Sequence, residues 1–371
     1  MGVCKMTEWI DKFNPFNSMK VLTHPEKFEA ILARKPLSPI VINFDMTNKC
    51  NYSCRFCMFG GRKRADETSE TYRYNKKELP SEYIKTLPKI WKDWGIKAEC
   101  IGGGGEPTMH PYCLEHIVDV AKQGIDIGFV TNGLLVDNPH YWNTVVKNTK
   151  WVGFSVDAGN KQDYAEVKGV SQNNFNRILE NLRGLSEAKK RLNTKCNIGY
   201  KFLLDDKNYT SIFQAAETAK MVGCNTFQFR PAINDYVYSP KQIDFIQEQI
   251  TNAQEFLEDD NFHVYGVTHK FNPDFTKKHK FDKCRATMLS TTWCADGGVY
   301  MCTDTRGNPW AKLTEHYPNP RDVIKYWGSK EHWDKVDKID FKNKCDRCTL
   351  AFPNEAFEKV FIEDKMERNL I

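Results

Sequence analysis

The chain has 371 residues, of which 40% are hydrophobic, and a formal net charge of +5 at pH 7. This length predicts one large α/β unit and a smaller module, and the mild charge does not favour a nucleic-acid-binding protein. No apolar run approaches the ~18 residues of a membrane helix, and the chain start lacks the layout of a signal peptide, so we expect a cytoplasmic protein.

From residue 40 onward, short apolar runs rich in β-branched residues alternate with longer amphipathic runs. The predicted strands cover residues 40–47, 97–103, 126–132, 151–157, 196–204 and 226–233. The predicted helices cover residues 81–94, 113–123, 139–148, 173–192, 209–222 and 240–258. Such β-then-α units predict a parallel sheet with helices outside it, either a partial (β/α)6 TIM-like barrel or an open doubly wound sheet.

This alternation also suggests domain limits. A helical start and a proline-containing lead-in precede it, and it stops near residue 262, where short strands, turns and cysteines follow. We therefore divide the chain into a lead-in at 1–39, a barrel core at 40–261 and a small α+β module at 262–371. Ligands bind at the carboxyl ends of parallel strands, which is where the unusual polar motifs of the core fall.

The thirteen cysteines are an odd number for disulfide pairing, and eight of them fall in two groups whose spacing is typical of metal sites. The first group has the spacing C-x3-C-x2-C and consists of Cys50, Cys54 and Cys57. A closed metal site takes four protein ligands, so three thiolates on an iron–sulfur cluster leave one iron open, as a catalytic site requires. From spacing alone, a zinc clip is the alternative.

With Phe56 before its last cysteine, this loop resembles the C-x3-C-x-aromatic-C signature of the radical S-adenosylmethionine (SAM) enzymes. In that family the open iron of a [4Fe-4S] cluster binds the amino and carboxylate groups of SAM. An electron from the cluster then cleaves the sulfonium and yields a 5′-deoxyadenosyl radical. The resemblance implies that the backbone near Phe56 lies against the adenine, and that a flavodoxin- or ferredoxin-type donor supplies the electron.

Polar motifs follow the next predicted strands. A glycine run after the second strand exposes backbone groups to a ligand, and it contains the family's motif as Gly104, Gly105, Glu106 and Pro107. The resemblance implies that this motif accepts hydrogen bonds from the SAM ammonium group. Asn132 and Arg230 end two further strands at the same rim, either as SAM or substrate contacts or as turn and capping residues.

Ser155 and Asp157 end the fourth predicted strand, and their alternation with apolar neighbours predicts that both point the same way, as partners of a ribose diol would. An Asx turn is the alternative reading of this aspartate. Related enzymes carry an arginine before a glycine in the following helix, where it grips the SAM carboxylate. Here Lys168 precedes Gly169, which replaces a bidentate fork with a point charge.

The second cysteine group resembles the auxiliary-cluster modules called SPASM and twitch, which open with a Cys, a gap, a Gly, four residues and a Cys. Spacing alone allows either zinc or a second cluster. No cysteine follows the final C-x2-C pair, so we favour the shorter twitch form. Its [4Fe-4S] cluster would be held by Cys284, Cys302, Cys345 and Cys348. Cys294 could replace one of these ligands.

The resemblance implies a radical SAM oxidoreductase that abstracts a hydrogen atom from an unactivated C–H bond. The residues before the first strand are too few for the leader-binding domain that often delivers peptides, which favours a small alcohol, sugar or cyclitol as substrate. A peptide-modifying maturase and an RNA-modifying enzyme are the alternatives. The protein would orient the substrate and exclude water around it.

Oxidation of an alcohol also needs a base, and epimerisation needs a hydrogen donor. Asp304 follows the second auxiliary cysteine, and Asp235, Tyr236 and Tyr238 follow the sixth predicted strand. Each of these is a candidate base, with a solvated surface side chain as the alternative. The Cys294 thiol is the candidate hydrogen donor for an epimerase.

Overall fold

The computed structural model describes residues 12–57, 59, 76–232, 236, 238–266, 279–345 and 348–365. Strands within these residues form a ten-stranded sheet in the order β10-β9-β8-β1-β2-β3-β4-β5-β6-β7. The strands from β1 to β7 are parallel, β8 is parallel to β1, and β9 and β10 are antiparallel to their neighbours. Their bounds are β1 Val41–Phe44, β2 Ala98–Ile101, β3 Asp126–Thr131, β4 Trp151–Ser155, β5 Asn197–Leu204, β6 Thr226–Pro231, β7 His263–Gly266, β8 Ser290–Trp293, β9 Gly298–Tyr300 and β10 Lys312–Glu315.

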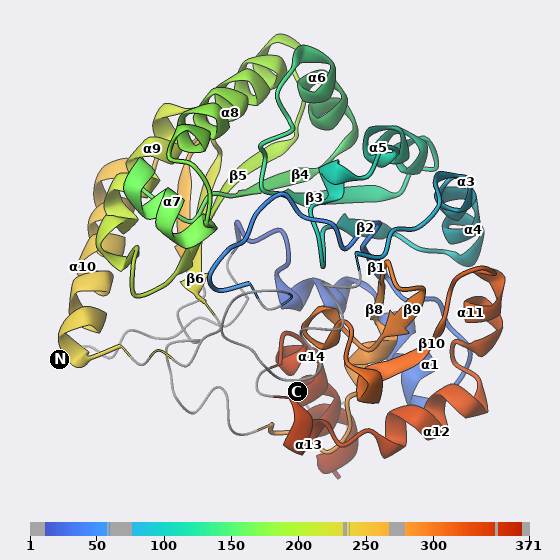
Figure 1. The fold of residues 1–371 in the computed structure, drawn as a ribbon. Helices are drawn as coiled ribbons and strands as arrows, with labels where there is room; N and C mark the ends of the chain where they lie inside the picture. The colour runs from blue at the N-terminus through green and yellow to red at the C-terminus, as the bar shows by residue number, and fades with distance from the viewer. Residues whose placement is uncertain are drawn as a thin grey trace.

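Helices cover one face of this sheet, and Figure 1 shows β1 to β6 following an arc with α5, α6, α8, α9 and α10 outside it. We call the helix-covered side the outer face and the concave side the inner face. The helices are α1 Pro25–Leu32, α3 Ser81–Ile84, α4 Leu87–Trp94, α5 Cys113–Lys122, α6 Pro139–Asn148, α7 Lys161–Lys168, α8 Asn173–Arg191, α9 Ile212–Met221, α10 Pro240–Leu257, α11 Arg321–Tyr326, α12 Lys330–Lys338, α13 Phe341–Lys344 and α14 Ala351–Ala356. No helix among the described residues is long and apolar enough to cross a membrane.

The six predicted strands and the parallel α/β architecture are confirmed. The helix predicted at 81–94 is two helices, α3 and α4, because Pro88 lacks a backbone N–H and is tolerated only in the first turn of a helix. The sequence prediction missed β7, which adds a further parallel strand beside β6, and the polar helix α7.

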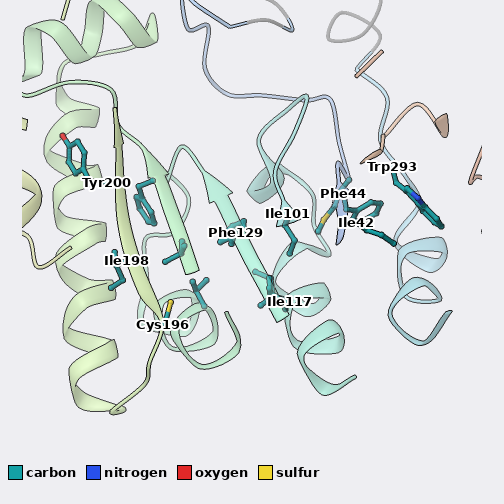
Figure 2. Close-up of a cluster of buried hydrophobic side chains, with 14 of the residues drawn as sticks. Ile42, Phe44, Ile101, Ile117, Phe129, Cys196, Ile198, Tyr200 and Trp293 are labelled. Carbon is teal, nitrogen blue, oxygen red and sulfur yellow. The ribbon is translucent and has the colours of Figure 1, made fainter. Parts of the chain in front are cut away.

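The main hydrophobic core lies between the outer face and the helices. Alternate residues of β1, Ile42 and Phe44, are fully buried there, and Figure 2 shows them with Ile101, Phe129 and Ile117 of α5. Burial alternates with a period of two along β2 and β3, and successive side chains of a strand point to opposite faces, so the residues between the core-facing ones point to the inner face. The polar and charged residues of the core that remain available for chemistry are therefore on the concave side.

The C-terminal segment joins the core without a break in the sheet. Strand β8 pairs with β1 from Val41↔Ser290 to Phe44↔Trp293, and the Trp293 ring packs edge-on against Trp91 of α4 at 5.7 Å. β7 lies at the opposite edge of the same sheet. Residues after 262 therefore contribute to both edges of the sheet.

Candidate active site

The first cysteine group lies in the loop that follows β1, and its three residues are partly exposed, although burial raises the pKa of the Cys54 thiol to about 12. The loop is held by backbone hydrogen bonds to the end of α7, where Ser53 N–H donates to the Lys168 carbonyl at 3.2 Å and Arg55 N–H to the Val167 carbonyl at 3.0 Å. These bonds fix the main chain on both sides of Cys54. The unpredicted helix α7 is thus the support on which the cysteine loop rests.

Two further contacts join α7 to this loop. The hydroxyl groups of Tyr52 and Tyr164 lie 2.7 Å apart in a buried hydrogen bond. Gly169 ends α7 with a left-handed φ of 65°, and a Cβ at this position would lie 2.7 Å from the Ser53 carbonyl oxygen. A side chain would therefore push the helix away from the loop, which explains why glycine follows Lys168.

Three of the predicted SAM-site residues converge beside this loop. The Lys168 ammonium donates to a carboxylate oxygen of Asp157 and lies 5.8 Å from the centre of the Phe56 ring. Burial lowers the pKa of Lys168, but the charges of Asp157 and Cys54 raise it, and the net shift is upward. Lys168 is therefore a cation at neutral pH although its side chain is 2% exposed. The lysine that stands where related enzymes carry an arginine therefore keeps a positive charge at this point.

Asp157 lies beyond the end of β4 with a left-handed φ of 60°. The alternation of side-chain directions along the strand therefore does not extend from Ser155 to Asp157. Its Oδ1 accepts a hydrogen bond from Leu203 N–H at 2.7 Å, and its Oδ2 binds Lys168. Ser155 is partly exposed and pairs in register with Lys201 of β5. The aspartate thus positions Lys168, while the serine lies open on the inner face.

The glycine run packs closely against the loop that follows β1. A Cβ at Gly103, whose φ is 127°, would lie 1.9 Å from Asp45 Oδ1, and a Cβ at Gly105 would lie 2.2 Å from the Lys49 carbonyl oxygen. Glu106 N–H donates to that same carbonyl at 2.8 Å. Glycines are required here because two backbone segments meet with no room for side chains.

The Glu106 carboxylate is buried and joins the segment after β2 to the end of β3. One oxygen accepts from the Thr131 hydroxyl at 2.6 Å and the Thr108 hydroxyl at 2.7 Å, and the other accepts from Asn132 N–H at 2.7 Å. Burial raises the pKa of Glu106, and these hydrogen bonds oppose the rise. The Asn132 side chain in turn donates to Asn51 of the cysteine loop at 2.7 Å. Both predicted residues therefore fix the rim around the cysteine loop.

The C-terminal segment contacts this rim through an ion pair that the sequence did not predict. Arg306 Nε lies 2.9 Å from Asp45 Oδ2, and the two side chains are 11% and 0% exposed. The same Asp45 oxygen accepts from Gly104 N–H at 3.3 Å. One carboxylate therefore connects the C-terminal module with the glycine run.

The second cysteine group brings distant segments together. Burial raises the pKa of Cys284 to about 11, and burial together with Asp304 and Cys284 raises the pKa of Cys302 to about 12. Burial also raises the pKa of Cys348, and Cys284 and Cys302 add to the rise. Cys284 and Cys302 therefore lie close enough to other thiols of this group to affect their pKa values. The remaining cysteine, Cys345, is partly exposed and closes α13 with a hydrogen bond to Phe341.

Polar side chains lie against two sulfurs of this group. Asn354 Nδ2 lies 3.6 Å from Cys284 Sγ, and Thr305 Oγ1 lies 3.8 Å from Cys302 Sγ. Within the described segments, no three Cys, His or acidic side chains converge closely enough to hold a single metal ion, as a tetrahedral zinc site requires. Four-iron clusters distribute their thiolates over separate irons and do not need that convergence.

The candidate bases and the candidate hydrogen donor are in different places. Asp304 accepts a hydrogen bond from the Thr349 hydroxyl, beside the auxiliary cysteines. Cys294 is fully buried and follows the carboxyl end of β8, where it packs with Tyr300 and Phe59. Cys284 precedes the amino end of the same strand, so β8 separates these two cysteines.

The remaining candidates follow β6. Asp235 lies outside the described residues. Tyr236 accepts a hydrogen bond from Gln242 at 2.6 Å, and its ring packs edge-on against Tyr238 at 4.9 Å. Arg230 ends β6 beside Leu203 of β5. Sequence reasoning missed Lys201, Arg306 and Asp45, which carry no motif and become neighbours of the site only through strand pairing and the return of the C-terminal segment.

Comparisons with known proteins agree with this site. The family model described as the radical SAM superfamily matches residues 44–204. A probable GTP 3′,8-cyclase of Pyrobaculum aerophilum is 27% identical over 150 residues, which are 40% of this chain and 43% of that protein. An S-adenosylmethionine-dependent nucleotide dehydratase of Psychrobacter lutiphocae is 23% identical over 168 residues, 43% of this chain and 55% of that protein. The matches thus span about half the length of these relatives.

Among solved structures, SuiB of Streptococcus suis bound to S-adenosylmethionine superposes with a TM-score of 0.62 and 15% identity, covering 94% of this chain and 80% of SuiB. SuiB bound to its precursor peptide SuiA gives a TM-score of 0.61, also at 15% identity. At this identity the likeness shows the fold. The matched segment contains the cysteine loop, the glycine run, Asp157 and Lys168, so residues 44–204 form a radical SAM domain, and the chain is an enzyme.

Proposed function

We propose that this enzyme is a radical SAM oxidoreductase that takes a hydrogen atom from an unactivated C–H bond of a small alcohol, sugar or cyclitol and oxidises that carbon. A [4Fe-4S] cluster bound by Cys50, Cys54 and Cys57 would supply the electron that splits SAM into methionine and a 5′-deoxyadenosyl radical. A flavodoxin- or ferredoxin-type protein would deliver the electron. The chain itself binds and orients SAM and substrate and keeps water from the radical.

The observation that carries this proposal is the convergence of Phe56, Asp157 and Lys168 around the cysteine loop. Asp157 holds the Lys168 ammonium, and the Phe56 ring lies 5.8 Å from it. A buried lysine that stays cationic is a suitable partner for the SAM carboxylate. Three cysteines on one anchored loop fit a cluster with one open iron.

We further propose that Cys284, Cys302, Cys345 and Cys348 hold an auxiliary [4Fe-4S] cluster that accepts the second electron of the oxidation. Support comes from the effect of Cys284 on the pKa of Cys302 and of both thiols on the pKa of Cys348. In this assignment Asp304, which lies beside these thiols, is the candidate base.

Anaerobic reconstitution with iron and sulfide tests both assignments. We expect about eight irons per chain, four for each cluster, and release of 5′-deoxyadenosine on addition of SAM and reductant. Deuterium transfer from labelled candidate metabolites into 5′-deoxyadenosine would then identify the substrate. A fully loaded, oxygen-free sample that never cleaves SAM would contradict the proposal.

A peptide-modifying function is the second candidate, because the fold similarity to SuiB extends over 94% of this chain. Cys294→Ala separates the two. A dehydrogenase keeps its turnover in this variant, whereas an epimerase that uses the Cys294 thiol stops after the first hydrogen abstraction and forms no epimer. Loss of about four irons from the variant would instead identify Cys294 as a cluster ligand.

A further inference from the structure

The turn that follows β5, residues 205–208, contacts the cysteine loop through side chains. Arg55 follows Cys54 in that loop. Its Nη1 lies 3.2 Å from Asp205 Oδ1, which belongs to a side chain that is 2% exposed, and its Nη2 lies 3.1 Å from Asp206 Oδ1. A planar guanidinium that pairs with two carboxylates at once is held in one orientation. The turn therefore restrains the cysteine loop in addition to the main-chain bonds from α7.

The same turn also fixes the main chain at Asp157. Asn208 is fully buried, and its Oδ1 accepts a hydrogen bond from Asp205 N–H at 2.7 Å. Its Nδ2 donates to the carbonyl oxygens of Asp157 and Leu203, each at 2.8 Å. Asp157 in turn binds the Lys168 ammonium through its carboxylate. The position of the Asp157–Lys168 pair therefore depends on the turn.

These contacts connect the two halves of the predicted SAM site a second time. One half is the cysteine loop, and the other is the Asp157–Lys168 pair. The halves meet directly at the end of α7, where Ser53 N–H donates to the Lys168 carbonyl at 3.2 Å. They also meet through Arg55, the turn and Asn208. Two connections through different elements fix the spacing between the halves more firmly than one.

A ligand that contacts both halves binds tightly when the spacing between them matches it, and a small misplacement of either half weakens it. We propose that residues 205–208 form a bracket that sets this spacing, and that Arg55 and Asn208 are positioning residues for SAM. Neither residue needs to touch SAM or the cluster in this role. The inference deepens the proposed function and rests on it, because it takes the cysteine loop and Lys168 as the two halves of the SAM site.

Hydrogen exchange of the metal-free protein under native conditions tests the bracket without a cofactor. Asn208→Ala removes hydrogen bonds within the turn and to Asp157, and we expect the Ser53 and Arg55 amides of the cysteine loop to exchange about ten-fold faster. Arg55→Met should have the same effect on the Ser53 amide. The amides of α4 should keep their protection, which shows that each variant is folded. Faster exchange in Asn208→Ala that is confined to residues 205–208 would overturn the inference.

Calorimetric titration of the reconstituted protein with SAM, without reductant, tests the positioning role. Arg55→Met should retain its iron and bind SAM about ten-fold more weakly, and Arg55→Lys, which keeps the charge but loses the fork, should recover part of the affinity. Lys207→Met is the matched control from the same turn. Lys207 pairs with Glu166 and Asp206 at 3.8 and 3.9 Å near the surface, so its loss should leave SAM affinity unchanged. Unchanged affinity in Arg55→Met, or equal weakening in Lys207→Met, would contradict the positioning role.

A double variant distinguishes one bracket from two independent contacts. Asn208→Ala alone should also weaken SAM binding by about ten-fold. Because either change opens the bracket, Arg55→Met combined with Asn208→Ala should weaken SAM by much less than the product of the two single effects. Effects that multiply would mean that the two residues act separately, and the bracket would be refuted.

The two proposals fail separately. If the reconstituted enzyme never releases 5′-deoxyadenosine, the radical chemistry is wrong, while exchange in the metal-free protein still shows whether the bracket holds the loop. If 5′-deoxyadenosine is released but Asn208→Ala leaves the loop amides protected, the bracket is wrong and the radical chemistry stands.

Discussion

The two cysteine groups of this chain are built in different ways. The first lies within one loop, and backbone hydrogen bonds from α7 fix the main chain on both sides of Cys54. The second draws its cysteines from separate segments around β8 and α14, and side chains such as Asn354 and Thr305 lie against its sulfurs. Main-chain anchoring within one loop fixes the first group locally, whereas the second group depends on the packing of distant segments. The two groups do not differ clearly in exposure, because Cys284 is buried but Cys302, Cys345 and Cys348 are partly exposed, as are the three cysteines of the first group.

The largest effect should separate the two groups by function. Cys54→Ala should reduce 5′-deoxyadenosine formation to the level of an enzyme-free control, because the open-iron cluster loses one of its three thiolates. Cys348→Ala should retain about four irons per chain and continue to cleave SAM, but should form no oxidised product. Iron analysis and quantification of 5′-deoxyadenosine check both variants. Equal loss of SAM cleavage in the two would show that the groups are not independent.

Lys168 is the proposed partner of the SAM carboxylate beside the first group, so its replacement should have the next largest effect. Lys168→Met leaves the buried Asp157 carboxylate without its cation, which should lower the free energy of unfolding by about 3–5 kcal/mol. SAM binding should weaken as well, since the proposed carboxylate partner is lost. Lys168→Arg restores the charge and should recover both properties. Denaturant unfolding and calorimetric SAM titration measure them.

A double variant controls for the buried charge. In Lys168→Met with Asp157→Asn, the uncompensated carboxylate is absent, so stability should recover while SAM binding stays weak. Recovery of SAM binding together with stability would show that Lys168 has only a structural role.

Arg306 connects the two regions, and its removal should have an intermediate effect. Arg306→Met breaks the ion pair with the fully buried Asp45, which also binds Gly104 N–H. We expect a loss of stability of about 3 kcal/mol and slower 5′-deoxyadenosine formation, because the glycine run loses its support. The stability loss of the double variant Arg306→Met with Asp45→Asn should be smaller than the sum of the losses in the two single variants. Additive losses would mean that the two side chains act separately.

Local patterns were sufficient to predict six strands of the sheet and to single out both cysteine groups. Short apolar runs rich in β-branched residues predicted β1 to β6, and the spacing around Cys54 predicted the loop that α7 supports. The sequence did not predict α7 itself, because "KQDYAEVK" has few apolar residues and its stability comes from an Asn160 cap and from packing on the cysteine loop. Lys201 and Arg306 were missed because their neighbours are set by strand register and by the return of the C-terminal segment, which no short window of sequence contains.

The smallest effect concerns the glycine that lets α7 approach the cysteine loop. Gly169→Ala places a methyl group 2.7 Å from the Ser53 carbonyl and also adopts a left-handed φ of 65°. Gly124 has a similar φ of 71°, but the nearest atom to its added Cβ, Lys92 Nζ, is 3.7 Å away. Gly124→Ala should therefore cost only the backbone strain of about 1–2 kcal/mol, and Gly169→Ala should cost more and weaken SAM binding. Unfolding free energies of the two variants isolate the contact with the loop, since the backbone term is common to both. Equal costs would mean that α7 and the cysteine loop separate without penalty, and that the main-chain anchoring which distinguishes the first cysteine group does not restrain it.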